Sequence, residues 1–204
     1  MTRTLRVGHI VPDTEAEGPG RRFAIWVQGC PLRCPSCCNP ELLPFAGGTE
    51  WTIDALLARI VTTPDIEGVT FLGGEPMSQP GGVLALARAV RAAGLSVMVF
   101  TGFTLAELRA RKRADIDELL RHIDLLVDGR YDREQPDTER RWIGSRNQVM
   151  HFQSERYSPA DRQFREPETV EIRLSPEGLV VNGWPAAAAA LLRPARADTA
   201  DPVA

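Results

Sequence analysis

Several features that would point to other classes of protein are absent from these 204 residues. No apolar run approaches the roughly 20 residues of a membrane span, and the N-terminal stretch MTRTLRVGHIVPDT lacks the apolar core of a signal peptide. Lys112 is the only lysine, and a formal net charge of -3 gives no reason to expect a polyanionic partner. We therefore expect a cytoplasmic protein that binds neither membranes nor nucleic acids.

Cysteine is missing from almost the whole chain, because every cysteine lies in the stretch GCPLRCPSCCNP. Structural disulfides are rare in a reducing cytoplasm, where clustered cysteines more often bind metal or carry out redox chemistry. Cys30, Cys34 and Cys37 form a C-x3-C-x2-C pattern, and Cys38 follows directly. An extended chain covers at most about 3.3–3.6 Å per residue, so these gaps keep three sulfurs within one short loop. The spacing predicts a site for one compact inorganic group.

A structural zinc ion and an iron–sulfur cluster are the two groups that we considered for this loop. Zinc takes four tetrahedral ligands, usually as two separated pairs, but the sequence has no second C-x2-C and its histidines show no ligand spacing. Cys38 is a poor fourth ligand, since neighbouring side chains of extended backbone point in opposite directions. We therefore predict a 4Fe–4S cluster with one open iron, held by Cys30, Cys34 and Cys37. Cys38 is interpreted as a small, partly buried residue.

Hydrophobic patterns predict strands that alternate with helices. The predicted strands lie near residues 21–30, 68–72, 95–102 and 122–129, and the predicted helices cover 49–63, 83–94 and the residues after Thr104. Thr52 is suited to cap the first helix, Gly94 to end the second, and Thr104 with Glu107 to form a capping box. Because a complete eight-fold barrel needs about 250 residues, we expect an α/β fold with an incomplete (βα) barrel or a curved, mostly parallel sheet flanked by helices.

The later part of the chain predicts no second domain. Residues 168–185 alternate like a strand pair joined through Ser-Pro-Glu-Gly. We expect a single domain over 1–185 and a disordered tail over 186–204. Cys30, Gly73, Thr101 and Asp128 fall at or near the carboxyl ends of predicted strands, where sheets of this kind bind ligands. We therefore expect them to share one site.

Residues 17–40, EGPGRRFAIWVQGCPLRCPSCCNP, resemble the activases of glycyl radical enzymes, which belong to the radical S-adenosylmethionine (SAM) superfamily. C-x3-C-x2-C is the cluster signature of that superfamily, and FLGGEP at 71–76 resembles its GGEP motif. IDLLVDGRY at 123–131 and RWIGSRNQ at 141–148 resemble the activating proteins of anaerobic ribonucleotide reductase. Two positions depart from the pattern: Ser36, where many members have an aromatic residue, and Cys38, where another residue type is usual.

The resemblance implies an enzyme that reductively cleaves SAM at a 4Fe–4S cluster to make a 5′-deoxyadenosyl radical, with no catalytic side chains beyond the cluster and SAM site. It implies that a side chain added at Gly74 would enter the space of the methionine moiety. In the resemblance, the backbone of Gly73 and Gly74, with Glu75, contacts the SAM amino group. The backbone around Ser36, Cys37 and Cys38 contacts the adenine, and Asn39 braces the cysteine loop. Thr101 faces the ribose, and Asp128 lies at the floor of the site.

The same resemblance implies two protein partners. One is a large glycyl-radical-type protein, whose loop would enter near residues 18–22 and the loop after Asp128. The other is a low-potential electron donor such as a flavodoxin or ferredoxin. Two alternatives stay open: a radical SAM enzyme that modifies a peptide or small metabolite, and a non-catalytic Fe–S electron-transfer protein. The GGEP motif disfavours the last, because an electron carrier needs no SAM site.

Overall fold

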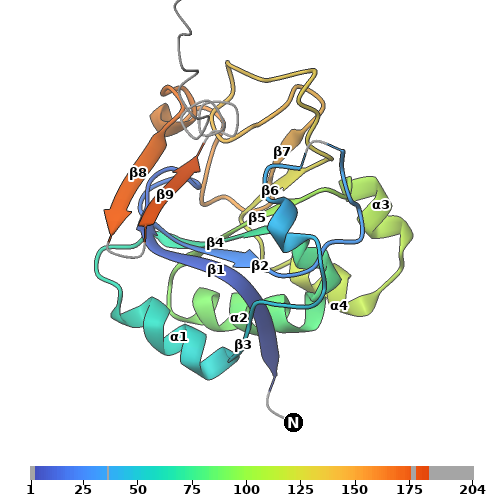
Figure 1. Cartoon of the computed structure of the whole chain (residues 1–204), viewed down its shortest axis with the longest axis vertical. Helices are drawn as coiled ribbons and strands as arrows, with labels where there is room; N and C mark the ends of the chain where they lie inside the picture. The colour runs from blue at the N-terminus through green and yellow to red at the C-terminus, as the bar shows by residue number, and fades with distance from the viewer. Residues whose placement is uncertain (1–2, 36, 176–177, 184–204) are drawn as a thin grey trace, which may run out of the picture.

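The computed structural model describes residues 3–35, 37–175 and 178–183. Seven strands form one sheet in the order β3-β1-β2-β4-β5-β6-β7 (Figure 1). The central strands run parallel and are β2 (Arg22–Val27), β4 (Gly68–Gly73), β5 (Ser96–Thr101) and β6 (Leu125–Asp128). Antiparallel strands flank them, namely β1 (Thr4–Thr14), β3 (Thr49–Thr52) and β7 (Val149–Phe152). The α/β class is confirmed, but the barrel is not.

Helices cover one face of this sheet, in agreement with the predicted sheet flanked by helices. They are α1 (Ile53–Thr62), α2 (Pro80–Ala92), α3 (Leu105–Ala110) and α4 (Ala114–Leu120), and Figure 1 shows α1, α2 and α4 along the same face. Thr52 Oγ1 accepts a hydrogen bond from the N–H of Ala55 at 3.2 Å, and Thr104 and Glu107 form the predicted capping box. Within the described residues, no helix is both long enough and apolar enough to cross a membrane.

The sheet is buried on both faces, which explains the continuous hydrophobic runs of its parallel strands. Along β2, Phe23, Ile25 and Val27 belong to the core between the sheet and the helices. Ala24 and Trp26 point to the other face. Loops cover that second face, in place of helices. Its clusters include Leu42 from the segment after β2 and, from the chain after β6, Trp142, Ile143 and Tyr157.

A separate hairpin confirms the strand pair predicted near the end of the chain. It consists of β8 (Val170–Ser175) and β9 (Gly178–Gly183), which pair antiparallel. Asn182 Nδ2 donates to Thr14 Oγ1 at 2.8 Å, and the N–H of Gly183 donates to Glu17 Oε1 at 2.8 Å, so the hairpin is attached to the β1–β2 connection. A single domain over 1–185 stays a prediction, and the predicted tail 186–204 lies outside the described residues.

Candidate functional site

The parallel strands bring the predicted site residues to one edge of the sheet. Val27 pairs with Gly73 at the carboxyl ends of β2 and β4, and Thr101 pairs with Asp128 at the ends of β5 and β6. Cys30 follows β2 after two intervening residues. The cysteine stretch and the Gly-Gly-Glu-Pro turn therefore lie at neighbouring strand ends, as the sequence predicted.

Residues 28–48, called the cluster loop from here on, leave β2 and return toward β3. Two backbone hydrogen bonds close its neck: the N–H of Gly29 donates to Leu42 O at 2.8 Å, and the N–H of Cys30 donates to Leu43 O at 3.0 Å. Gln28 Nε2 adds a bond to Pro44 O at 2.7 Å. A short 3-10 helix, η1 (Pro40–Leu42), lies inside the neck and buries Leu42 against the sheet. The loop is therefore held at its base by the protein's own bonds.

The four cysteines are reduced and differ in exposure. Cys30 is buried, Cys34 and Cys37 are half-buried, and Cys38 is exposed. The residue Cys38 as a whole is therefore more exposed than the partly buried position that we expected. Its thiol is nevertheless shielded from water, and this desolvation, with the nearby Cys37 and Cys34 thiols, raises its pKa to about 12. Burial also raises the pKa of the Cys30 and Cys34 thiols.

These thiols fit a four-iron cluster better than a single ion. Within the described residues, no three His, Cys, Asp or Glu side chains lie close enough together to hold one metal ion. In a four-iron cubane each cysteine sulfur binds a different iron. The cluster therefore needs three free thiols in one loop, but these thiols need not converge on a single metal ion. The N–H of Cys37 donates to Cys34 O at 3.2 Å, and Arg33 has a left-handed φ of 47°, so the chain turns tightly between the thiols. The assignment of Cys30, Cys34 and Cys37 as ligands stays a prediction.

The Gly-Gly-Glu-Pro turn is bonded directly to the start of the cluster loop. The N–H of Gly74 donates to Val27 O at 2.8 Å, and the N–H of Glu75 donates to Gly29 O at 2.9 Å. A Cβ atom at Gly74 would lie 2.6 Å from Gly29 O. The expectation that such a side chain would enter ligand space is therefore wrong, since it would strike the loop backbone. Gly73 has a φ of 95°, which favours glycine.

Glu75 and Thr101 are bonded to each other and to nearby backbone. Glu75 Oε1 accepts hydrogen bonds from Thr101 Oγ1 at 2.8 Å and from the N–H of Met77 at 2.8 Å. Its Oε2 accepts from the N–H of Gly102 at 2.9 Å. Burial raises the pKa of this carboxyl to about 7. The contacts predicted for Glu75 with the SAM amino group and for Thr101 with the ribose stay predictions.

The remaining predicted residues have the following surroundings. Asp128 Oδ2 accepts a hydrogen bond from the N–H of Leu105 at 2.6 Å, at the start of α3, and lies 3.0 Å from His151 Nε2. Asn39 accepts a backbone bond from Leu42 at 3.1 Å, and its side chain makes no capping bond. Ser36 lies outside the described residues. The roles assigned to all three stay predictions.

Sequence reasoning missed Gln79, which joins three segments near the site. Its Oε1 accepts from the N–H of Arg6 at 2.8 Å, and its Nε2 donates to Arg6 O at 2.9 Å and to Gln28 O at 3.0 Å. The residue therefore ties β1 and the cluster loop to the turn before α2. A glutamine between a motif and a helix-starting proline was its only signal in the sequence.

Two other regions lie at the opposite end of the parallel strands. Arg22 begins β2, is fully buried, and donates to Val69 O at 2.7 Å and Thr70 Oγ1 at 3.0 Å. The expectation that a partner's loop enters near residues 18–22 is therefore wrong, because these residues are far from the carboxyl edge.

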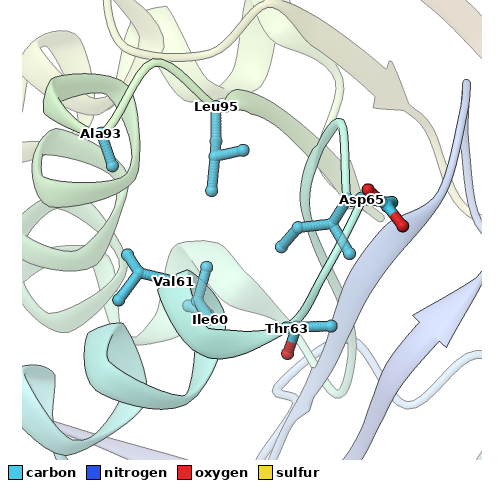
Figure 2. Close-up of a pocket in the computed structure, with 7 residues that line it drawn as sticks. Ile60, Val61, Thr63, Asp65, Ala93 and Leu95 are labelled. Atoms are coloured by element: carbon cyan, nitrogen blue, oxygen red, sulfur yellow. The ribbon is translucent and has the colours of Figure 1, made fainter.

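A cavity of about 160 Å³ between the ends of α1 and α2 is also at the amino end of the strands (Figure 2). It is lined by Ile60, Val61, Thr63, Asp65, Ile66, Ala93 and Leu95.

Comparison with known proteins gives consistent matches. Residues 16–151 match the family described as 4Fe-4S single cluster domain. The chain is 34% identical over 148 residues to the anaerobic ribonucleoside-triphosphate reductase-activating protein of Vibrio cholerae, covering 69% of this chain and 93% of that protein. The protein of the same name from Escherichia coli is 32% identical over 143 residues, covering 66% and 90%. The pyruvate formate-lyase-activating enzyme of Clostridium pasteurianum is 32% identical over 116 residues, covering 54% and 46%.

Proposed function

Because this chain belongs to the 4Fe-4S single cluster domain family, we propose that it is a radical SAM activase that places a glycyl radical on a partner enzyme. When bound, the cluster and SAM supply a 5′-deoxyadenosyl radical by reductive cleavage of the cofactor. The single observation that carries the proposal is the direct bonding of the Gly-Gly-Glu-Pro turn to the neck of the cysteine loop. That bonding supports the proposal, because it holds the turn proposed to bind SAM beside the predicted cluster ligands.

The protein's own residues have three tasks in this proposal. Cys30, Cys34 and Cys37 would hold three irons and leave the fourth for SAM. The turn at Gly73 and Gly74 would present strand-end backbone to the amino group of the cofactor. The hydrogen bonds of Glu75 to Thr101 and Gly102 would hold that turn in place for the cofactor.

The partner is proposed to be an anaerobic ribonucleotide reductase-type protein. The Vibrio cholerae and Escherichia coli relatives are named as activating proteins of that reductase, and the alignments cover 93% and 90% of them. The pyruvate formate-lyase-activating enzyme matches over only 46% of its length. A low-potential donor such as a flavodoxin or ferredoxin would supply the electron.

The test is the appearance of a radical on the partner. The reduced protein, SAM and a large glycyl-radical-type polypeptide should together give a glycyl doublet in electron paramagnetic resonance. Deuterium placed on the partner's glycine α-carbon should appear in 5′-deoxyadenosine. Cys34→Ala is the matched control and should give neither signal. Deuterium arriving instead from a short peptide or a metabolite would contradict the activase and favour an enzyme that modifies such a substrate.

A further inference from the structure

The loop between β6 and β7, residues 129–148, contains parts of two motifs that the proposed function leaves without a role. Gly129-Arg130-Tyr131 starts it and GSRNQ, residues 144–148, ends it. The loop leaves the sheet at the same carboxyl edge as the cluster loop, and Figure 1 shows it on the side of the sheet away from α2 and α4. The hydrogen bonds of this loop connect the residues of one motif to those of the other.

One side chain joins the two ends of this loop. Gln148 Nε2 donates to Gly129 O at 3.0 Å, while Gln148 Oε1 accepts from the N–H groups of Gly144 and Ser145, both at 3.1 Å. Gln148 is 9% exposed, so these bonds are largely shielded from water. A glutamine is required here, because the site needs a donor and an acceptor on one planar group.

Further bonds fix the first residues of the loop. Asn147 Nδ2 donates to Arg130 O at 2.7 Å, and the N–H of Asp132 donates to Ser145 Oγ at 3.0 Å. Together with the bond from Gln148 to Gly129, they hold the backbone on both sides of Tyr131. The position of Tyr131 is therefore set by the GSRNQ end of the loop.

Tyr131 packs on Gly144. A Cβ atom at that glycine would lie 3.0 Å from Tyr131 Cδ2, so a larger residue at position 144 would displace the ring. Burial, and then the nearby Cys38 thiol, raise the pKa of the Tyr131 phenol, which is consistent with a ring beside the cluster loop.

The adjacency of the two loops also rests on geometry. Leu32 of the cluster loop and Arg130 both approach Gly102: a Cβ atom there would lie 2.5 Å from Leu32 Cδ1 and 3.9 Å from Arg130 Cγ. The residue before Tyr131 is therefore close to the segment between the first two predicted ligands.

We propose that Gln148 is a positioning residue for the cluster: by joining the ends of the 129–148 loop, it holds the Tyr131 ring against the cluster loop and covers one side of the cluster. The inference deepens the proposed function of this site. It rests on one part of that function, namely that a cluster is bound by the cluster loop. It does not depend on SAM or on the identity of the partner.

The test measures how fast the reconstituted protein loses iron to bathophenanthroline disulfonate without oxygen. Gln148→Leu removes several hydrogen bonds and should speed the loss by roughly tenfold. Tyr131→Leu should do the same, whereas Tyr131→Phe should match the wild type because the ring provides the cover. Gln153→Leu, at an exposed glutamine just after β7, is the matched control and should also match the wild type.

A double variant separates positioning from a general structural role. Because Gln148 acts through Tyr131, Gln148→Leu combined with Tyr131→Leu should lose iron no faster than Tyr131→Leu alone. Rates that multiply, or a Gln148→Leu rate equal to the wild type, would overturn the proposal. If Gln148→Leu does not fold, the comparison of Tyr131→Leu with Tyr131→Phe decides, and equal rates for these two would overturn it. Failure to cleave SAM would refute the proposed function and leave these rates measurable.

Discussion

The hydroxyl of Thr101 donates a hydrogen bond of 2.8 Å to Glu75 Oε1 and so joins the carboxyl end of β5 to the turn after β4. The same hydroxyl oxygen accepts from the N–H of Phe103 at 3.2 Å. Both partners are buried, at 1% and 4% exposure for Glu75 and Thr101. The motif turn and the next strand are therefore one bonded unit at the predicted SAM site.

Replacing Thr101 by Val should destabilise the protein without cofactor. It removes one donor to Glu75 and leaves the N–H of Phe103 without its acceptor, so the free energy of unfolding should fall by about 1–3 kcal/mol. Thr101→Ser keeps the hydroxyl and should retain most of the stability. Urea unfolding of the apo-protein measures both. Equal stability of the Val and Ser variants would show that the bond contributes nothing.

Single cysteine replacements should separate ligands from the extra thiol. Anaerobic reconstitution should give about four irons per wild-type chain. Cys30→Ala, Cys34→Ala and Cys37→Ala should each abolish cluster retention, because each removes one of the three predicted ligands. Cys38→Ala should keep the cluster, as measured by iron and sulfide content. Complete loss of the cluster in Cys38→Ala would refute the ligand assignment.

Two glycines should respond in opposite ways to the same change. Gly74→Ala places a Cβ atom 2.6 Å from Gly29 O and should cost about 1–3 kcal/mol of unfolding free energy, with weaker cluster retention. Gly81 lies in α2 with no atom within 4 Å of an added Cβ, so Gly81→Ala is the matched control. It should stabilise the helix by about 0.5–1 kcal/mol. Thermal melts and iron content measure both effects.

Glu17 should make stability fall as pH rises. Burial, with smaller contributions from Glu171 and Glu168, raises the pKa of this carboxyl from its ordinary 4.5 to about 8. The folded state therefore holds a proton that the unfolded state releases, and the stabilisation present below about pH 4.5 is lost as pH rises toward 8.

Glu17→Gln should remove that pH dependence. The amide cannot ionise and can still accept from the N–H of Gly183. Its stability relative to wild type should increase by up to about 1.4 kcal/mol per pH unit between pH 5 and 8, as measured by urea unfolding. Glu15→Gln, at an exposed neighbouring position, should follow the wild-type profile. Parallel profiles for wild type and Glu17→Gln would show that Glu17 is ionised in the folded protein.

The parts of the fold that depend on local pattern were predictable. The buried runs of β2 and β5, the N-cap at Thr52 and the capping box at Thr104 each follow from neighbouring residues. The strand β1 was missed, because its residues alternate irregularly around two register shifts and its pairing with β2 is antiparallel. Barrel closure could not be decided, since it depends on how far strands tilt and how the edges meet.

The site shows a similar division. Spacing placed Cys30 and Gly73 at the same edge of the sheet, since parallel strand ends meet there. The direction of individual side chains was not predictable, so the bond of Glu75 to Thr101 and the direction of a Cβ at Gly74 were missed. The entry expected near residues 18–22 followed from the resemblance, and burial could not be read from the sequence there: Arg22 is fully buried at the amino end of β2.

The closed neck of the cluster loop bears on how the protein matures. Because Gly29 and Cys30 are bonded to Leu42 and Leu43 by backbone alone, the loop keeps its base without any inorganic group. Delivery of iron and sulfide would then follow synthesis and folding as a separate, later event.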